Sequence, residues 1–219
     1  MNSIVRPKSL TELVSEKLRD MIVSGELELG SQLSEVRIAK DFAVSRTPVR
    51  EAFNRLEMEG LLTVSPQKGT FVFSLSPHQI AMLCDARVCL ERTAMSTALE
   101  QNPDQLHKRL EVVVAEMTEA LRDDRVQHYL SLDAVYHQCL FDCSGNRFLD
   151  DAYQTIAKKM AAVRHRLGHH PDHLEKSYKE HCEIADAVGR RDLAASLAIL
   201  GQHIDRKQGS YWQLATLGQ

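Results

Sequence analysis

The sequence predicts a mostly α-helical protein, with an N-terminal winged helix-turn-helix domain at residues 1–75 and a C-terminal all-α six-helix bundle at residues 76–219. Three observations lead to this fold class. Two short helical patterns joined by a tight turn lie within residues 34–60, and a two-stranded hairpin pattern follows them. From residue 75 onward the apolar residues recur almost entirely at helical spacing, so a domain boundary is expected near residues 74–77.

The first predicted element is a helix over residues 9–24. Ser9 and Glu12 have the spacing of a capping box at its start, and Gly25 can end it. This helix would support the winged domain by burying its apolar face. The residues expected on that face are Leu10, Leu13, Val14, Leu18, Met21 and Ile22.

Two helices with a tight turn between them are expected next. Ser34 can cap a helix of about two turns, and Ser45 can cap a second helix that runs to about Glu59. Pro48 falls in the first turn of the second helix, where proline is tolerated, and Gly60 stands where a left-handed residue commonly ends a helix. This order of elements predicts a helix-turn-helix.

The second of these helices has two distinct faces. The apolar face consists of Val49, Ala52, Phe53 and Leu56. Arg46, Arg50 and Asn54 recur every four residues on another face. In a helix-turn-helix the N-terminal residues of the second helix reach the base edges of DNA, and arginine can donate two parallel hydrogen bonds to guanine. Arg46 and Arg50 are therefore predicted to contact DNA.

A small hairpin follows the second helix. Residues 61–64 and 70–73 have the pattern of short strands, and the turn between them contains Lys68 and Gly69. Such a hairpin would form the wing, with the lysine against a phosphate or in the minor groove. The alternative is a solvated hairpin with an ordinary surface lysine.

These residues resemble the DNA-binding domain of the GntR family of bacterial transcription regulators. The matching strings are L-S-E-x-R-I-A, V-S-R-T-P-V-R-E-A, R-L-E-x-E-G-L and K-G-T-F-V, and the resemblance covers residues 9–73. It implies binding to double-stranded operator DNA as a homodimer. The DNA contacts that it implies fall on Arg37, Arg46, Thr47, Arg50, Lys68 and Gly69. For Arg37, a solvated helix charge is the alternative.

The overall composition constrains the partners. The net charge is −3, with 27 Lys and Arg against 30 Asp and Glu, so the positive charge that meets DNA must be local. The sequence has no apolar run near eighteen residues and no charged-then-apolar leader, so we expect a cytoplasmic protein without a membrane partner. Five cysteines without a CxxC pair are expected to be buried hydrophobic residues rather than redox or metal sites.

The C-terminal part is expected to form six helices. Ser76 can cap the first, Pro77 fits its first turn, and Asn102 and Pro103 can start the second. The expected helices span residues 76–101, 102–123, 125–143, 146–167, 172–189 and 191–215. Helices without a strand signal predict an all-α bundle.

A group of metal-ligand residue types lies within this predicted bundle. Asp133 and His137 are four residues apart, so they project from one face of a helix. His181 and His203 lie in apolar segments of the last two helices. Three imidazoles and a carboxylate suit a divalent metal such as zinc, nickel or manganese. Ordinary core or surface histidines remain the alternative, because the sequence does not give the spacing across three helices.

Residues 77–216 resemble the helical effector-binding (FCD) domain of the FadR-like subfamily, and six helices resemble its VanR-type branch. The matching strings are L-D-A-V-Y-H, K-E-H-C-E-I-A-D-A-V and L-G-Q-H-I. The resemblance implies a metal held by Asp133, His137, His181 and His203. It also implies that Arg87, and with less support Arg164, binds a small organic acid effector through its carboxylate. A surface ion pair is the alternative for either arginine.

Three functions follow from these patterns. The leading one is a transcription regulator, with repression favoured by the family, whose operator affinity is controlled by a small carboxylate bound near the metal. The second is a metalloregulator in which the metal is the signal. The third, a metal-dependent hydrolase with a DNA-binding appendage, is disfavoured because no separate general base is evident near the ligands, and no catalytic residue is assigned. The sequence leaves open the effector, the metal and the operator.

Overall fold

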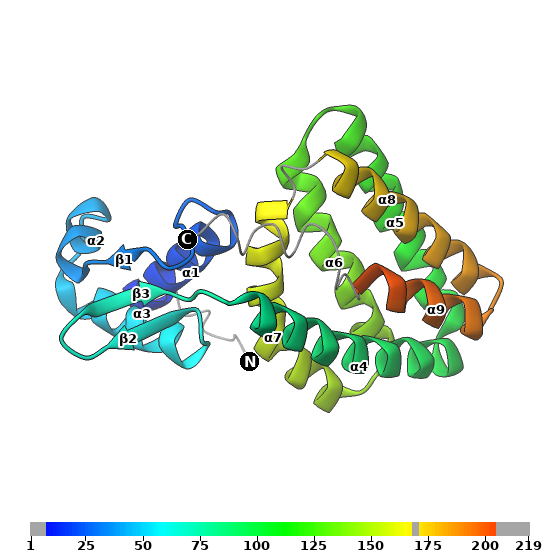
Figure 1. The fold of residues 1–219 in the computed structure, drawn as a ribbon, viewed down its shortest axis with the longest axis horizontal. Coiled ribbons are helices and arrows are strands. Elements are labelled where there is room, and N and C mark those ends of the chain that lie inside the picture. The colour runs from blue at the N-terminus through cyan, green and yellow to red at the C-terminus, as the bar shows by residue number, and fades with distance from the viewer. Residues whose placement is uncertain (1–7, 168–170, 205–219) are drawn as a thin grey trace, which may run out of the picture. The chain divides into compact units, whose positions relative to one another are not determined.

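The computed structural model describes residues 8–167 and 171–204, and this part of the chain forms nine helices and three short strands (Figure 1). The chain divides into two compact units between Ser74 and Leu75. The predicted fold class is confirmed, since a winged helix-turn-helix unit precedes a bundle of six helices. Within the described residues, no helix is long and apolar enough to cross a membrane.

The first unit combines three helices with a three-stranded antiparallel sheet. The helices are α1 (Leu10–Val23), α2 (Glu35–Asp41) and α3 (Arg46–Met58), and the strands are β1 (Gln32–Leu33), β2 (Leu62–Ser65) and β3 (Gly69–Val72). The strand order is β1-β3-β2, with Thr63 opposite Phe71 and Leu33 opposite Thr70. The hairpin of β2 and β3 is the predicted wing.

In the first unit, the helices begin at the predicted capping residues, and one of these residues lacks a capping hydrogen bond. The backbone N–H of Ser9 donates to Glu12 Oε2 at 2.8 Å, and the N–H of Glu12 donates to Ser9 Oγ at 3.2 Å, which completes the capping box. Ser34 Oγ accepts from the N–H of Arg37. Ser45 has an extended backbone at the N-cap of α3, but its side chain makes no capping hydrogen bond.

The core of the winged unit lies between α1 and α3, and its fully buried side chains include Leu18, Ile22, Val49, Leu56 and Leu61. The expectation for two leucines was wrong, because Leu10 and Leu13 are 57% and 48% exposed. The buried face of α1 instead includes Thr11 and Ser15, whose hydroxyls are satisfied by hydrogen bonds to the Glu51 carboxylate and to the Thr11 carbonyl. Two hydroxyl side chains of α1 are therefore buried, whereas the apolar periodicity had predicted burial of Leu10 and Leu13.

Strand β1 was not predicted. Gln32 and Leu33 pair with Phe71 and Thr70 of β3, so the wing has a third strand. Two residues are too few to show an alternation of apolar and polar side chains, and only the pairing with β3 defines this strand. The pairing joins β3 of the wing to the segment that leads into α2.

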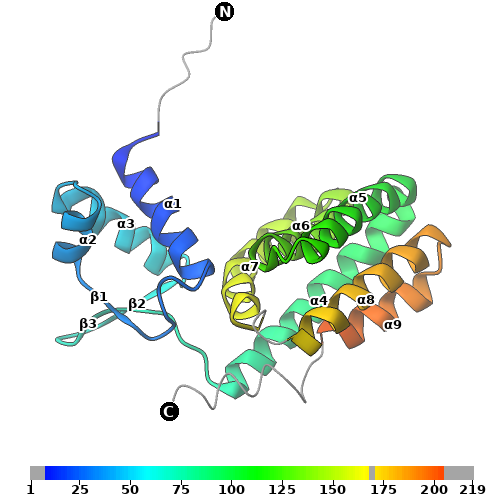
Figure 2. The same cartoon turned by 90° about the horizontal axis from the view of Figure 1, so that it is seen from above.

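The second unit is the six-helix bundle. Its helices are α4 (Pro77–Gln101), α5 (Pro103–Arg122), α6 (Val126–Ser144), α7 (Arg147–Leu167), α8 (Pro171–Gly189) and α9 (Leu193–Ile204). The helix expected over residues 191–215 is seen through Ile204, and its remainder lies outside the described residues. Contacts join five helices into a closed ring in the order α4, α9, α8, α5 and α6, and α7 packs against α6 and α4. Figure 2 shows α5 beside α6 and α8 beside α9.

The interior of the ring is largely apolar, with Met95, Leu106, Leu110 and Tyr136 fully buried. The cysteine expectation holds in part. The thiols of Cys84, Cys139 and Cys143 are buried, Cys182 is half-buried and Cys89 is exposed. Burial raises the pKa of the Cys139 thiol to about 11, so this thiol stays protonated and behaves as a small apolar side chain.

Candidate metal centre and nucleic-acid interface

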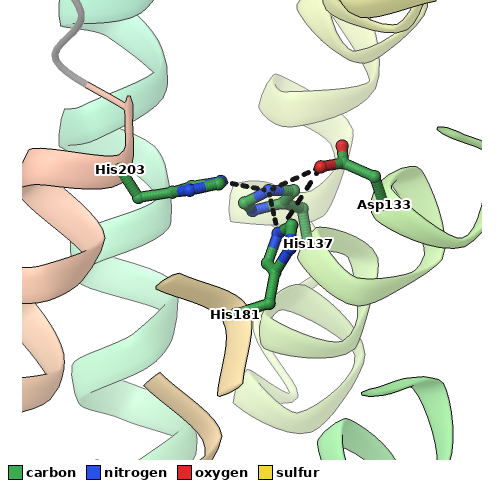
Figure 3. Close-up of side chains that lie close together, drawn as sticks. All are labelled: Asp133, His137, His181 and His203. Carbon is green, nitrogen blue, oxygen red and sulfur yellow. Dashed lines mark hydrogen bonds and ion pairs between the residues drawn. The ribbon is translucent and has the colours of Figure 1, made fainter. Parts of the chain in front are cut away.

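Four side chains from three helices converge inside the bundle (Figure 3). Asp133 and His137 come from α6, His181 from α8 and His203 from α9. The Nε2 atom of His137 lies 3.5 Å from that of His181 and 3.2 Å from that of His203. Asp133 Oδ1 lies 3.4 Å from His181 Nε2, and the four donor atoms all lie within 4.8 Å of one another.

This cluster is shielded from solvent. The exposed fractions are 0% for His137 and His181, 3% for Asp133 and 4% for His203. Polar groups at such depth are costly unless each is satisfied. A single shared proton would satisfy two of the four atoms that face the centre, whereas one divalent cation would satisfy all four. The donor set of three imidazole nitrogens and one carboxylate oxygen therefore fits zinc, nickel or manganese.

The other ring nitrogen of each histidine has a partner of its own. His137 Nδ1 lies 2.6 Å from Glu91 Oε2, His203 Nδ1 lies 2.9 Å from Glu180 Oε2, and His181 Nδ1 lies 3.4 Å from the Tyr129 hydroxyl. A carboxylate accepts the Nδ1 proton, so the Nε2 lone pairs of His137 and His203 face the centre. Partners of this kind are typical of metal-binding histidines.

None of these three partners was predicted from the sequence. In the sequence, Glu91 is distinguished only as an acidic residue four positions after Arg87, within an apolar-patterned segment. Glu180 directly precedes His181 in the sequence, yet it serves His203. The available signal was a carboxylate in a helix face expected to be buried, which requires a partner but does not identify it.

Asp133 has different neighbours at its two carboxylate oxygens. Oδ1 faces the histidines, while Oδ2 accepts a hydrogen bond from the Arg164 guanidinium of α7. Both side chains are buried, with Arg164 only 6% exposed. The arginine therefore orients the carboxylate through Oδ2, while Oδ1 faces the histidines.

Arg87 is linked to His137 through Glu91, whose carboxylate lies between the two side chains. Its Nε donates to Glu91 Oε1, and Glu91 in turn contacts His137, so the three form a buried chain from α4 to α6. Burial by itself raises the pKa of the Glu91 carboxyl. The charges of Arg87 and His137, together with their hydrogen bonds, outweigh burial and lower that pKa to about 2. Glu91 is thus a fixed negative charge behind His137.

A narrow pocket adjoins the metal-ligand cluster. Asp133 and His203 form one side of it, and Arg164 lies in its wall. The remaining lining residues are Tyr129, Leu130, His173, Leu174 and Ser177. Arg87 is not part of this lining. Of the two arginines expected to bind an effector, only Arg164 therefore reaches both the pocket and the cluster.

The two arginines predicted to contact DNA bases lie together at the start of α3. Arg46 and Arg50 are 58% and 61% exposed at their side chains, and both pair with Glu35 of α2. Arg46 Nη2 lies 3.1 Å from Glu35 Oε2, while Arg50 Nε lies 3.3 Å from Glu35 Oε1. These bonds hold two exposed guanidiniums side by side. Glu35 was not predicted to take part.

The other predicted DNA contacts are also at the surface. Thr47 is exposed beside Arg46, and the Arg37 side chain is 83% exposed, 3.7 Å from Asp41. Lys68 and Gly69 lie at the turn of the wing, where the Gln32 amide donates to the Lys68 carbonyl at 2.8 Å. Gly69 has a φ of +114°, a conformation that only glycine adopts easily.

Two family models match the chain. The model of bacterial regulatory proteins of the gntR family matches residues 10–72. The FCD domain model matches residues 82–206. Together they cover the winged unit and most of the bundle.

Similar proteins support the same assignment. An HTH-type transcriptional regulator in an unstable DNA locus of Streptomyces ambofaciens is 33% identical over 199 residues, covering 86% of this chain and 79% of that protein. The HTH-type transcriptional repressor RspR of Escherichia coli K12 is 27% identical over 197 residues, covering 90% and 86%. The solved structure of E. coli McbR/YncC has the same fold, with a TM-score of 0.80, 21% identity and coverage of 95% and 99%.

Proposed function

Since this chain belongs to the GntR family of bacterial regulatory proteins and is a DNA-binding transcriptional regulator with an FCD domain, we propose an effector-controlled repressor. It binds a palindromic double-stranded operator as a homodimer. A small organic acid enters the pocket beside the metal centre and releases the DNA. The observation that carries this proposal is the convergence of four buried donor atoms within 4.8 Å, next to a pocket whose wall contains an arginine.

The winged unit supplies the DNA contacts. Arg46, Thr47 and Arg50 are exposed at the N-terminal end of α3, the part of a recognition helix that reaches base edges in the major groove. In this proposal Lys68 and Gly69 at the wing turn contact the DNA backbone or the minor groove, and Arg37 of α2 contacts a phosphate. A homodimer follows from the two-fold symmetry of helix-turn-helix operators.

The bundle supplies the metal site. Asp133, His137, His181 and His203 would hold the divalent ion, and Glu91 and Glu180 keep two of the histidines in the tautomer that this requires. When bound, the metal supplies a Lewis-acidic contact for one carboxylate oxygen of the effector. Ligand nitrogens must be unprotonated, so metal affinity falls as the pH is lowered.

Arg164 determines the class of effector. A guanidinium in the pocket wall would select a carboxylate, and the apolar Leu130 and Leu174 would contact the carbon skeleton of the acid. For release of DNA, the acid must bind the two geometries of the dimer unequally, because a ligand with equal affinity for both shifts nothing. Repression, rather than activation, is the function named for RspR.

Fluorescence anisotropy tests this proposal. Metal-loaded protein is titrated onto a labelled duplex from upstream of its own gene, and small mono- and dicarboxylic acids are then added one at a time. We expect one acid to release the DNA from the wild type. The His181→Ala variant, which lacks one metal ligand, should stay bound at the same acid concentration.

A second candidate function is a metalloregulator, which is favoured by the burial of all four donors. It predicts DNA affinity that changes on chelation and is indifferent to every acid. That result would replace the effector-controlled repressor. Absence of binding to the duplex with either metal or chelator would contradict both functions for that DNA, and selection of a duplex from a randomised pool would then test DNA binding itself.

A further inference from the structure

A carboxylate lies between Arg46 and Arg50, the two arginines proposed to contact DNA bases. Glu35 is the first residue of α2, its side chain is 26% exposed, and it contacts both Arg46 and Arg50. A negative charge here lies where DNA phosphates approach, so it lowers the general attraction of the unit for DNA. A role in DNA affinity alone would not favour such a residue.

The geometry of the contacts leaves the arginines able to bind bases. Arg50 faces Glu35 with Nε and Nη2, each 3.3 Å from a carboxylate oxygen. A guanidinium has five N–H groups, so this side-on pair leaves the two hydrogens of Nη1 and one of Nη2. Those remaining donors form the end-on fork that recognises O6 and N7 of guanine. Glu35 thus holds the plane of the guanidinium without using its base-reading edge.

Arg46 is held by the same carboxylate. Its Nη2 lies 3.1 Å from Glu35 Oε2, the oxygen that also accepts from Arg50 Nη2. Hydrogen bonds from Arg50 lower the pKa of the Glu35 carboxyl, although partial burial opposes this, and Arg46 adds to the lowering. The three side chains carry a net charge of +1 instead of +2, so fewer phosphate contacts are favoured.

We propose that Glu35 is a specificity-determining residue that positions Arg46 and Arg50 for base recognition and suppresses their binding to phosphates of unrelated DNA. The inference rests on the proposed entry of α3 into the major groove. Ordering two long side chains before binding reduces the entropy lost in the complex with the right sequence. The reduced charge weakens binding to all other sequences, so both effects increase discrimination.

The test compares two duplexes of equal length. The first is selected by the wild-type protein from a randomised pool, and the second is its scrambled sequence. Dissociation constants are measured by anisotropy at several salt concentrations for the wild type, Glu35→Ala and Glu35→Gln. For Glu35→Ala we expect the ratio of the two constants to fall roughly tenfold, the scale of one lost bidentate base contact. Affinity for the scrambled duplex should rise.

Salt dependence separates this role from a merely structural one. An arginine freed to contact a phosphate makes the slope of log affinity against log salt steeper by about 0.9 for the scrambled duplex. Glu35→Gln keeps one acceptor oxygen and loses the charge. It should therefore raise the affinity for the scrambled duplex as Glu35→Ala does, while losing less affinity for the selected one.

Glu57→Gln is the matched control, because it removes one exposed negative charge from the far end of α3, about three helical turns from Arg46. It should change neither the ratio nor the slope. Equal changes on both duplexes for Glu35→Ala, with an unchanged ratio, would overturn the role of Glu35 while leaving operator binding intact. If the wild type itself did not prefer the selected duplex, the proposed operator recognition would fail together with this inference.

Discussion

Both units of this protein pair arginine with glutamate, but in different surroundings. Arg46 and Arg50 are about three-fifths exposed where they meet Glu35, whereas Arg87 and Glu91 are 1% and 0% exposed. An exposed pair is weak and screened by salt, so Glu35 can orient the two guanidiniums while their remaining N–H groups stay open to DNA. A buried pair cannot exchange partners without a large cost, and its role is to hold His137 in one orientation. The same pairing thus serves a solvent-exposed surface in one unit and a buried centre in the other.

The largest loss of stability is expected when the buried pair of Arg87 and Glu91 is broken. Arg87→Ala leaves the Glu91 carboxylate buried without its guanidinium, which should cost about 3–5 kcal/mol of stability. The matched control is Arg37→Ala, whose pair with Asp41 is exposed and should contribute less than about 1 kcal/mol. Calorimetric unfolding of the full-length variants measures both, and similar small losses would contradict the distinction between the two units.

Metal removal should have the next largest effect. A ligand present at a thousand times its dissociation constant stabilises the folded state by about 4 kcal/mol. Chelation should therefore lower the melting temperature of the full-length wild-type protein. The melting temperature of the full-length His181→Ala variant should stay nearly unchanged. A wild-type melting temperature that is indifferent to both chelator and added zinc, nickel or manganese would argue against a metal at this cluster.

A smaller effect is expected at the wing. Gly69 has a φ of +114°, and a Cβ added there would lie 2.8 Å from Gln32 Nε2, so Gly69→Ala should cost about 1–3 kcal/mol locally and weaken operator binding several-fold. Gly30→Ala is the control, since Gly30 has a φ of +78° but the nearest atom to its added Cβ is 3.8 Å away. It should lower stability while leaving DNA affinity unchanged. Equal DNA affinities for the two variants would mean that the wing does not contact the operator.

The sequence predicted what depends on local spacing. The caps at Ser9, Ser34 and Ser76 are present, and Asp133 and His137 share one face of α6 because they are four residues apart. In the winged unit, a short turn between two helices sufficed to predict the helix-turn-helix. These features require no knowledge of how distant segments meet.

Features that depend on helix packing were not predictable. Glu180 is adjacent in sequence to His181, yet its carboxylate meets His203, because the crossing of α8 and α9 decides which side chains face each other. Similarly, Arg164 lines the pocket and Arg87 does not, which depends on the rotation of α7 and α4 about their axes. Two residues of β1 form a strand only because β3 lies beside them.

The most direct test of the central claim, that one unit reads DNA and the other binds the metal, is a crossed measurement on two variants. Operator affinity by anisotropy and bound metal by elemental analysis are determined for Arg46→Ala and His181→Ala. We predict that Arg46→Ala loses roughly tenfold or more in operator affinity with full metal content. His181→Ala should lose the metal and keep its operator affinity in the absence of an acid. Retained operator affinity in Arg46→Ala, or full metal content in His181→Ala, would contradict the account.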